Sequence, residues 1–555
     1  RDTDRSRGLG DVYKRQISAI VAALPALAYS QTAVEAFQLS QSDLRGTARF
    51  MSMGGAFGAL GGDLSTLNNN PGGIGLYRKS EIGVTLDIEA ASIKSASSLA
   101  SQSTSQTKVS VPNFGYVGAA WLGNDVMPYF TWGISYGRIA NMNRHFKGQA
   151  RMNGSLYNYA ALGANGYSSN QLSADNDLEG YNSADYIPWL SVLAYNGMAI
   201  NPIGNTNQYQ GPWQNDDANG PSSGTSSFEV DQQGFVDEYA IDFGGNIMNT
   251  VYWGMGFGIT DIDMTQNTYY TENINNAVIM DPTAALGDLE IGTANTRLSN
   301  YSHIDGTGFN FKLGVIVRPI NALRFGIAFH TPTYYNINQT SGADLNFNYT
   351  FFNPDGYNNN YTGTPNEYRS WKLRTPWRLQ VSAAGIIGTS GIVSVEYEYR
   401  PYQNMTVRTD FGNDLPDYNN DIKNYYKAAN ILRLGAEYRI LPQLSLRAGY
   451  VYESTPTGAA VSNNESMVYT SNPDDTGTNP SYTLDNSTQY ITCGIGYRYK
   501  NFSIDAAYVY KHRTSEFHSF TPNDAFDAKG LTATPYQAKL TENYNNIVLT
   551  ATLRF

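Results

Sequence analysis

From about residue 80 onward, large apolar residues recur at every second position, in segments bounded by Gly, Asn, Asp and Pro. In VYWGMGFGIT, from Val251 to Thr260, they alternate mainly with glycine, and YFTWGISYGR, from Tyr129 to Arg138, follows the same rule. A period of two places successive residues on opposite faces of a β-strand. The pattern therefore predicts an all-β fold.

Fourteen such segments can be counted, and the connections between them alternate in length. The predicted strands are residues 80–93, 108–122, 129–146, 235–245, 251–265, 306–318, 324–337, 371–386, 391–402, 430–440, 444–453, 489–499, 502–512 and 545–555. Short turns near 123–128, 246–250, 319–322, 387–391, 440–443 and 500–501 alternate with long polar loops, the longest from about 147 to 234. A β-propeller or sandwich does not require this alternation. An even strand number with short turns on one side predicts a 14-stranded antiparallel transmembrane β-barrel over residues 80–555.

The last segment, NNIVLTATLRF, alternates apolar residues up to the final Phe555. In lipid every backbone N–H and C=O must be paired, and a closed sheet achieves this without free edges. We therefore expect the last strand to pair with the first. The terminal pattern also resembles the signal by which outer-membrane barrels are recognised for insertion, so the barrel-assembly machinery is an expected partner.

Composition agrees with a barrel and excludes other classes. Only 15% of residues are charged, 42 are Tyr and the mean hydropathy is -0.39. After residue 30 the sequence has no run of about 18 apolar residues, which a membrane-spanning helix needs. The net charge of -11 argues against a nucleic-acid partner. The single cysteine, Cys493, cannot form an intramolecular disulfide, and its alternating apolar neighbours indicate a small apolar side chain on a strand.

The residues before the barrel fall into three segments. Residues 1–16 lack an initiator Met and share no character with the rest, so we interpret them as a non-native scar. Residues 17–30 have the apolar core and small-residue exit of a signal peptide, with Lys14 and Arg15 as the positive flank. Residues 31–79 do not alternate and are too Gly-rich for a long stable helix.

The third segment carries a family resemblance. GTARFMSMGGAFGALGGDLSTLNNNPGGIGLYR, from Gly46 to Arg78, closely resembles the N-terminal plug of FadL-type long-chain fatty-acid transport proteins, particularly their Bacteroidetes-like members. The resemblance implies that residues 31–79 form a hatch inside a fourteen-stranded barrel. The family's hatch ends in Asn-Pro-Ala, and this chain has Asn70, Pro71 and Gly72, which the resemblance marks as hatch or gating residues.

The resemblance also implies a function. A hydrophobic small molecule, such as a long-chain fatty acid, would be caught among the outer loops, pass to a pocket in the barrel and leave laterally when the hatch shifts. The expected location is the outer membrane of a Gram-negative bacterium, with lipid and lipopolysaccharide around a monomer. Within the longest loop, YIPWLSVLAY, from Tyr186 to Tyr195, either captures ligand or packs over the barrel mouth.

A fatty-acid carboxylate would favour an inward cation. The candidates on the polar faces of strands are Lys312, Arg378, Arg433 and Arg447. Each of them could instead belong to a network of ion pairs inside the barrel. The expected acidic partners in that case are Glu396, Glu398, Glu437 and Asp505.

Catalytic and metal-binding patterns are weak. The pattern G-x-S-x-G occurs at 133–137, within a predicted strand, and at 220–224, in a polar loop, so neither has the strand-turn-helix setting of a nucleophile. His512 and His518 are six residues apart in a segment that we place in a loop, and this spacing matches no standard zinc site. We expect no catalytic residues, no metal and no cofactor. A porin-like or structural, surface-binding barrel and a lipid-hydrolysing barrel enzyme remain the alternatives.

Overall fold

The computed structural model describes residues 33–174, 180–181, 187–215, 220–280, 289–351, 357–458, 477–520 and 536–555. The segments interpreted as a scar and a signal peptide, residues 1–30, lie outside the described residues. Among the described residues, no helix has both the length and the apolar character needed to cross a membrane.

The chain forms nine short helices within the described ranges, and strands make up most of the rest. The helices are α2 (Ala33–Ser40), α3 (Ala48–Ser52), α4 (Thr66–Asn69), η1 (Pro71–Leu76), α5 (Leu156–Ala164), α6 (Ser169–Leu172), α7 (Trp189–Asn196), η2 (Tyr402–Asn404) and α8 (Pro416–Tyr425). The strands are β1 (Glu81–Ala96), β2 (Ser101–Trp121), β3 (Tyr129–Asn141), β4 (Arg144–Arg151), β5 (Asn201–Pro202), β6 (Tyr209–Gln210), β7 (Ser223–Ile247), β8 (Val251–Met280), β9 (Leu289–Ile320), β10 (Leu323–His330), β11 (Tyr334–Phe351), β12 (Tyr357–Gly363), β13 (Glu367–Arg374), β14 (Arg378–Ile387), β15 (Gly391–Pro401), β16 (Thr406–Thr409), β17 (Ala428–Leu441), β18 (Leu444–Glu453), β19 (Tyr482–Tyr499), β20 (Phe502–His518) and β21 (Gln537–Arg554).

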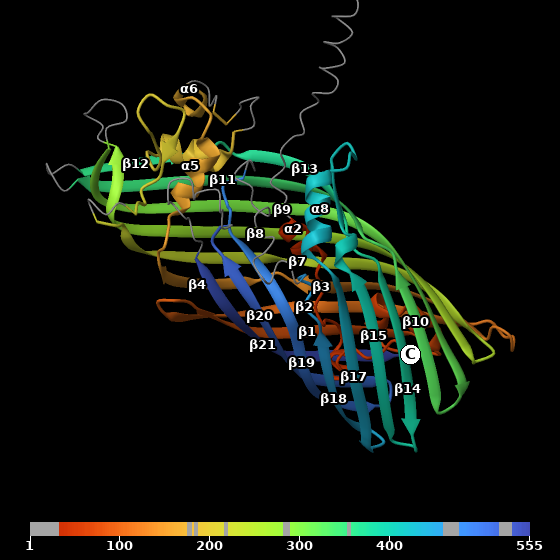
Figure 1. Ribbon diagram of the computed structural model, residues 1–555. Helices are drawn as coiled ribbons and strands as arrows, with labels where there is room; N and C mark the ends of the chain where they lie inside the picture. Colours follow the sequence, from red (N-terminus) through yellow and green to blue (C-terminus); the bar gives the residue numbers. More distant parts are fainter. Residues whose placement is uncertain are drawn as a thin grey trace, which may run out of the picture.

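These strands form a closed, 14-stranded antiparallel barrel (Figure 1). Three wall positions each hold two consecutive strands, namely β3 with β4, β10 with β11 and β15 with β16, and a fourth holds three, β12, β13 and β14. β21 pairs with β1 from Glu81↔Arg554 to Ala96↔Lys539, and Ser80 and Phe555 exchange two backbone hydrogen bonds. The expectation that the last strand pairs with the first is confirmed.

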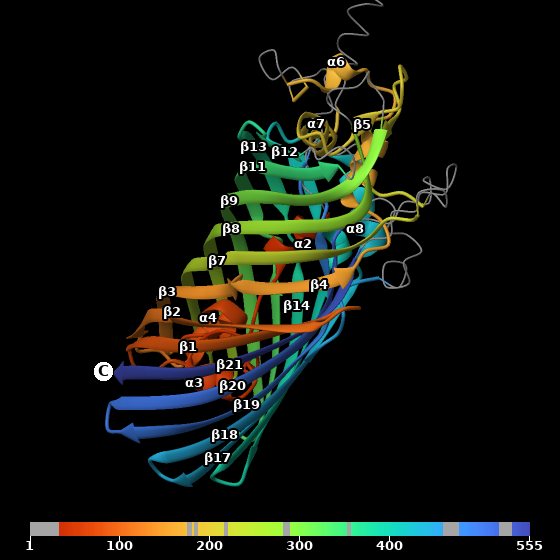
Figure 2. The ribbon, with the colours of Figure 1, turned by 90° about the vertical axis from the view of Figure 1, so that its left-hand side faces the viewer.

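Several strands are much longer than their alternating apolar pattern predicts. β8 and β9 contain 30 and 32 residues. At about 3.3 Å per residue they extend about 100 Å, whereas a tilted membrane-spanning strand needs only about ten residues. Their outer halves continue the sheet beyond the membrane (Figures 1 and 2). There the outward face is polar, whereas the inward face carries buried apolar residues such as Tyr270, Ile274 and Leu298. The predicted loop from 147 to 234 contains α5, α6, α7 and the start of β7.

Two further predictions about local structure are wrong. The segment with His512 and His518 is not a loop, because β20 continues to His518 and pairs with β19 and β21 throughout. The predicted strand 129–146 is interrupted after Asn141, and β4 begins at Arg144. In the first segment, polar residues mask the alternation of a strand. In the second, they mask the break between β3 and β4.

The predicted faces of the membrane-spanning strands are observed. Phe257 and Ile259 of β8 are 51% and 60% exposed and point outward, while Glu396 and Glu398 of β15 point inward and are fully buried. Cys493 is also on the exposed outward face. Outward apolar side chains match lipid, and inward charges are kept away from it.

The segment before β1 lies within the ring of strands, where α2, α3 and α4 are visible in Figure 2. We call residues 33–79 the hatch. It packs against opposite sides of the wall, because α3 contacts β18 to β21 and η1 contacts β3 and β7 to β10. Its apolar side chains, including Phe57, Leu67 and Ile74, are buried.

Candidate passage between the hatch and the barrel wall

Inward glycines of the wall receive the backbone of the hatch. A Cβ atom at Gly254 of β8 would overlap the carbonyl oxygen of Pro71, and one at Gly449 of β18 would overlap the amide nitrogen of Gly54. Gly254 and Gly449 are therefore explained by close backbone contact, whereas Cβ atoms at the next alternating glycines, Gly256 and Gly258, would meet the side chains of Asp242 and Glu238. A side chain at Gly254 or Gly449 would force the hatch away from the wall.

The three predicted hatch residues form a capped turn at this contact. The side chain of Asn70 accepts a hydrogen bond from the backbone N–H of Gly72 at 3.0 Å and donates one to the carbonyl of Gly58 at 2.6 Å. Pro71 occupies the first position of η1, where a missing N–H is tolerated. A Cβ at Gly72 would lie 2.9 Å from the backbone of Gly314, which explains the glycine at this position. Their role in gating stays a prediction.

Two of the four candidate cations are engaged by the expected acids. Arg433 pairs with Glu396 at 2.8 Å and with Glu398 at 2.7 Å. Arg447 bridges Glu437 and Asp505, both at 2.6 Å. For these two arginines, the geometry matches the ion-pair interpretation.

The other two candidates have different surroundings. Lys312 is fully buried, pairs with Glu238 of β7 and lies 3.5 Å from the side-chain oxygen of Asn68 in the hatch. Arg378 contacts Nδ1 of His330 at 3.1 Å. Among the described residues, no carboxylate lies within ion-pair distance of Arg378.

His330 links Arg378 to the hatch. Its Nε2 lies 2.6 Å from the carbonyl oxygen of Asn69. A guanidinium only donates, so Nδ1 must accept and Nε2 must carry the proton that is donated to Asn69. The imidazole is therefore neutral and oriented by two partners. Sequence reasoning missed this residue because its alternating position within a strand resembles any other inward residue.

The barrel wall has an unpaired seam between β2 and β4. The β2–β3 ladder ends at the pair Asn113↔Gly137, immediately beside Pro112, which has no N–H to donate. Beyond this point β2 is paired only with β1, and β4 is paired only with β7. Isolated side-chain contacts, such as Thr104 Oγ1 with the carbonyl of His145, connect the two edges. We call this gap in the ladder the seam.

A small cavity, with a volume of about 70 Å³, lies inside the barrel next to the seam. Pro112, Asn113 and Gly137 line it from the wall. Arg378 and Arg433 line it from the other side, and the hatch completes it with residues 42–46, 65, 68 and 69. The cavity thus joins the hatch, the seam and two of the four candidate cations.

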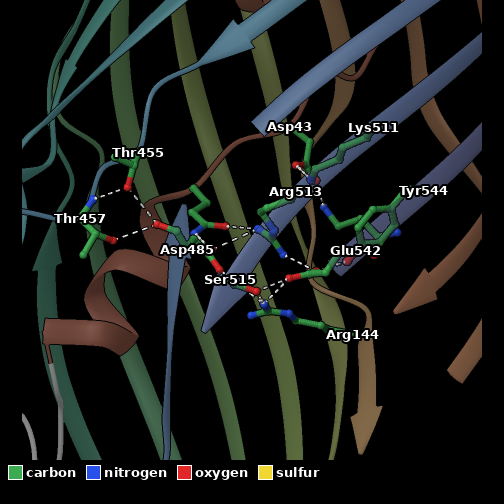
Figure 3. Close-up of polar contacts among 12 residues, drawn as sticks. Asp43, Arg144, Thr455, Thr457, Asp485, Lys511, Arg513, Ser515, Glu542 and Tyr544 are labelled. Carbon is green, nitrogen blue, oxygen red and sulfur yellow. Dashed lines mark hydrogen bonds and ion pairs between the residues drawn. The ribbon is translucent and has the colours of Figure 1, made fainter. Parts of the chain in front are cut away.

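A short hatch segment, residues 41–46, closes the seam from within, and we call it the strap. The backbone N–H of Asp43 donates to the carbonyl of Ile139 at 2.9 Å, and its carboxylate accepts from the N–H of Asn141 at 3.2 Å. Lys511 of β20 lies 2.5 Å from the same carboxylate (Figure 3). Arg45 pairs with both Asp87 and Glu89 of β1. Charged contacts therefore fasten the strap to both sides of the seam.

A second group of charges bridges the seam next to the strap (Figure 3). Arg144 of β4 pairs with Glu542 of β21 and lies 3.4 Å from Asp485 of β19. Arg513 of β20 contacts the same two carboxylates, Asp485 at 3.1 Å and Glu542 at 2.9 Å. The network ties β4, on one edge of the seam, to the strands that continue from its other edge.

Outside the membrane, the helices of the longest loop pack on the extended sheet. Tyr186 lies outside the described residues, and the rest of the apolar stretch includes α7, whose Leu190, Val192 and Leu193 are buried in one cluster with residues of β7 to β11. This supports packing over the barrel mouth, and ligand capture stays a prediction.

A single carboxylate anchors α5 to the same sheet. Glu272 of β8 accepts hydrogen bonds from Ser155 Oγ at 2.5 Å and from the N–H of Leu156 at 2.8 Å. Ser155 in turn caps the first turn of α5. Burial raises the pKa of Glu272 from its ordinary value of 4.5 to about 7.

The weak chemical motifs do not form reactive sites. The first G-x-S-x-G pattern lies within the regular ladder of β3, and the second precedes and enters β7. His512 contacts the side chain of Asn543, and His518 is stacked on Tyr482. In the part of the chain that the structure describes, no three His, Cys, Asp or Glu side chains gather as metal ligands.

Comparison with known proteins identifies the family. The model of the family described as "Outer membrane protein transport protein (OMPP1/FadL/TodX)" matches residues 246–555. The chain belongs to this family. It is therefore an outer-membrane transport protein for hydrophobic compounds. A search among curated proteins found no match.

One solved structure shares the fold, and two others are similar at lower TM-scores. A Pseudomonas aeruginosa FadL homologue is 14% identical, with 93% of this chain and 100% of that chain covered and a TM-score of 0.50. The P. putida toluene transporter TodX is also 14% identical, with coverages of 92% and 99% and a TM-score of 0.46. The Ralstonia pickettii toluene transporter TbuX is 13% identical, with coverages of 94% and 100% and a TM-score of 0.42.

Proposed function

We propose that this protein takes up hydrophobic molecules that carry a carboxylate, such as long-chain fatty acids, and releases them sideways into the membrane through the seam. The observation that carries the proposal is that the seam, the hatch and Arg378 border one cavity, of about 70 Å³, which movement of the hatch would enlarge. An apolar solute is disfavoured by a water-filled pore, so an exit that leads from an enclosed cavity into lipid suits it better.

Arg378 is the proposed contact for the carboxylate. Its described hydrogen-bond partner is a neutral imidazole, which leaves other guanidinium N–H groups for a carboxylate from the ligand. Lys312 is already paired with Glu238, and Arg447 lines a different cavity. Because His330 also contacts the hatch at Asn69, ligand binding at Arg378 would change the contact between His330 and the hatch.

The strap is the proposed gate of the seam. Asp43 and Arg45 hold it by contacts that a carboxylate or water can replace. Asn70, Pro71 and Gly72 are proposed to keep the rest of the hatch seated while the strap moves, because their turn docks directly on wall glycines. We propose that the barrel works as a monomer in lipid and lipopolysaccharide, after insertion by the barrel-assembly machinery.

Uptake of radiolabelled oleate tests the proposal, in cells that lack their own fatty-acid transporter and express either the wild type or Arg378→Gln. Loss of a charge-assisted hydrogen bond should lower oleate uptake at low concentration by about tenfold. Toluene has no carboxylate, so any uptake of it should be unaffected by the substitution. The matched control is Arg297→Gln, which removes an arginine that stacks on Tyr269 outside the cavity.

Three outcomes would count against the proposal. Unchanged oleate uptake in Arg378→Gln removes the carboxylate contact. Uptake of small polar solutes in place of oleate would support a porin-like barrel. A correctly inserted barrel without any uptake would support a structural or surface-binding role.

A further inference from the structure

A second cavity lies at the opposite face of the hatch, among the ends of strands that are joined by short turns. It has a volume of about 260 Å³ and is bordered by Thr47 and Asp63 of the hatch and by the ends of β17 to β21. Short turns of such barrels face the periplasm. The cavity shares no lining residue with the one beside the seam. We call it the periplasmic vestibule.

The vestibule is rich in arginine, although the whole chain is acidic. Its arginines are Arg49, Arg439, Arg447, Arg498 and Arg554. Its acidic residues are Asp63, Glu81, Glu437 and Asp505. Every one of these carboxylates already has a partner within the protein.

The partners of the four carboxylates are specific. Arg447 holds Glu437 and Asp505, both at 2.6 Å, and Arg554 pairs with Glu81. Asp63 accepts hydrogen bonds from Thr47 Oγ1 at 2.7 Å and from the backbone N–H of Ser65 at 3.0 Å. Beyond these contacts, the only ion pair described between these carboxylates and the remaining arginines is a long one of 3.4 Å between Arg49 and Glu437.

Arg439 and Arg498 are the arginines that remain. At the turns, the backbone N–H of Arg439 donates to the carbonyl of Ser390, and that of Arg498 donates to the carbonyl of Gln443. Among the described residues, neither guanidinium has an ion-pair partner. Both side chains are exposed to the vestibule. Arg498 is repelled by Arg554, Arg49 and Arg439 and attracted by Glu81, so cations outnumber anions around it. Like charges held together in a cavity favour the binding of an anion.

We propose that the periplasmic vestibule is an anion-binding site for a phosphate or carboxylate group, held by Arg439 and Arg498. Two planar guanidinium groups match the paired oxygens of such anions. The hydroxyl of Ser445 and one hydroxyl of the hydrogen-bonded pair Ser503–Thr552 can supply further donors, and the lining offers little apolar surface for an acyl chain. The ligand is therefore a polar anion, either a free solute or the headgroup of a lipid. This site is independent of which hydrophobic compound the barrel carries.

The test uses the purified full-length chain in neutral detergent at low ionic strength, titrated calorimetrically with inorganic phosphate. A second arm uses dihexanoyl phosphatidylglycerol below its micelle concentration, as a soluble phosphate headgroup. The variant Arg439→Gln/Arg498→Gln should bind both probes at least about tenfold more weakly than the wild type. Arg151→Gln/Arg297→Gln, with the same change in net charge but outside the vestibule, should bind as the wild type does.

The two arms separate the sources of the anion. Tighter binding of inorganic phosphate supports a free solute, and tighter binding of the lipid headgroup supports a lipid. If the Gln variant does not fold, as judged by heat-modifiable gel migration, the variant Arg439→Lys/Arg498→Lys is used to test the proposal instead. It keeps the charge but loses the planar fork, so weaker binding than in the wild type is required. Absence of binding to the wild type, or equal binding to the folded variants, overturns the proposal.

Discussion

The hatch meets the barrel wall in two chemically different ways. On the β8 and β18 sides, its backbone lies against glycines, as at Gly254 and Gly449, with no charge at the contact. On the seam side, the strap is held by Asp43 and Arg45 through ion pairs and hydrogen bonds. Close backbone contacts are lost together if the hatch moves, whereas ion pairs can exchange partners. The difference indicates an anchored side and a releasable side.

The largest effect on the hatch is expected when the ion pairs of the strap are removed. Arg45→Gln leaves Asp87 and Glu89 buried without their cation, and removal of one partner of a buried pair costs about 3 kcal/mol or more. Hydrogen exchange in residues 42–46 should therefore speed up strongly, while exchange in η1 should be unchanged. Equal protection of residues 42–46 in variant and wild type would falsify the releasable strap. Arg45→Gln with Asp87→Asn should recover part of the protection.

A carboxylate without a cation sharpens the comparison. The pKa of Glu272 is raised from 4.5 to about 7, so the folded state keeps its proton where the unfolded state has lost it. Docking of α5 is then fully stable below about pH 4.5 and weakens as the pH rises through 7, by up to about 3 kcal/mol. Hydrogen exchange of α5, corrected for the intrinsic pH effect, measures this. In Glu272→Gln the protection should not change with pH, and a wild type that behaves identically would contradict the prediction.

The glycine side can be broken by one methyl group. In Gly254→Ala the new Cβ overlaps the carbonyl of Pro71, and overpacking of this kind costs about 2 kcal/mol. Limited proteolysis should cut the hatch faster while the barrel stays heat-modifiable on gels. Gly385→Ala is the matched control, because its Cβ would meet only a side-chain methyl of Val393 at 3.7 Å. Equal cleavage in both variants would show that the close contact does not hold the hatch.

The smallest effect is expected on the outward face of the barrel. The comparison of the two hatch contacts depends on which side chains point inward, and this experiment tests that assignment. Cysteines at Met255 and Phe257, in a chain whose Cys493 is changed to Ser, should resist a membrane-impermeant thiol reagent because these positions face lipid. A cysteine at Asp231, in the outer half of β7, should react readily. Rapid reaction at Met255 would mean that the inward and outward faces have been exchanged.

The sequence predicted what depends on local alternation. Within the membrane, lipid requires apolar side chains at every second position, so the strands, their faces and the pairs of Arg433 with Glu398 and of Arg447 with Glu437, on adjacent strands, could be anticipated. Outside the membrane the outward face of a strand is wet, so the outer halves of β8 and β9 lack the outward apolar residues, and only their inward face is buried. The hatch could be recognised by its resemblance to a family, but not by periodicity.

The candidate site was less predictable because it is assembled from distant segments. Lys312 pairs with Glu238, which is 74 residues away and on another strand. His330 acts through its two ring nitrogens, which an alternating pattern does not distinguish from any inward side chain. One signal was available, since Pro112 lies within a predicted strand, and proline in a strand indicates an edge. It marks the end of the β2–β3 ladder.

The pairing of β21 with β1 constrains the order in which the molecule can fold. Asp43 and Lys511 are 468 residues apart, and Ser80 is bonded to Phe555, so the hatch and the first strand meet partners that are synthesised last. Contacts of such long range make folding slow, because the loops must close before the contacts can form. The strands that contact α3 are β18 to β21, and they lie in the C-terminal part of the chain. The hatch therefore reaches its seat only late in assembly, and the N-terminal segment must stay unattached until the ring is nearly complete.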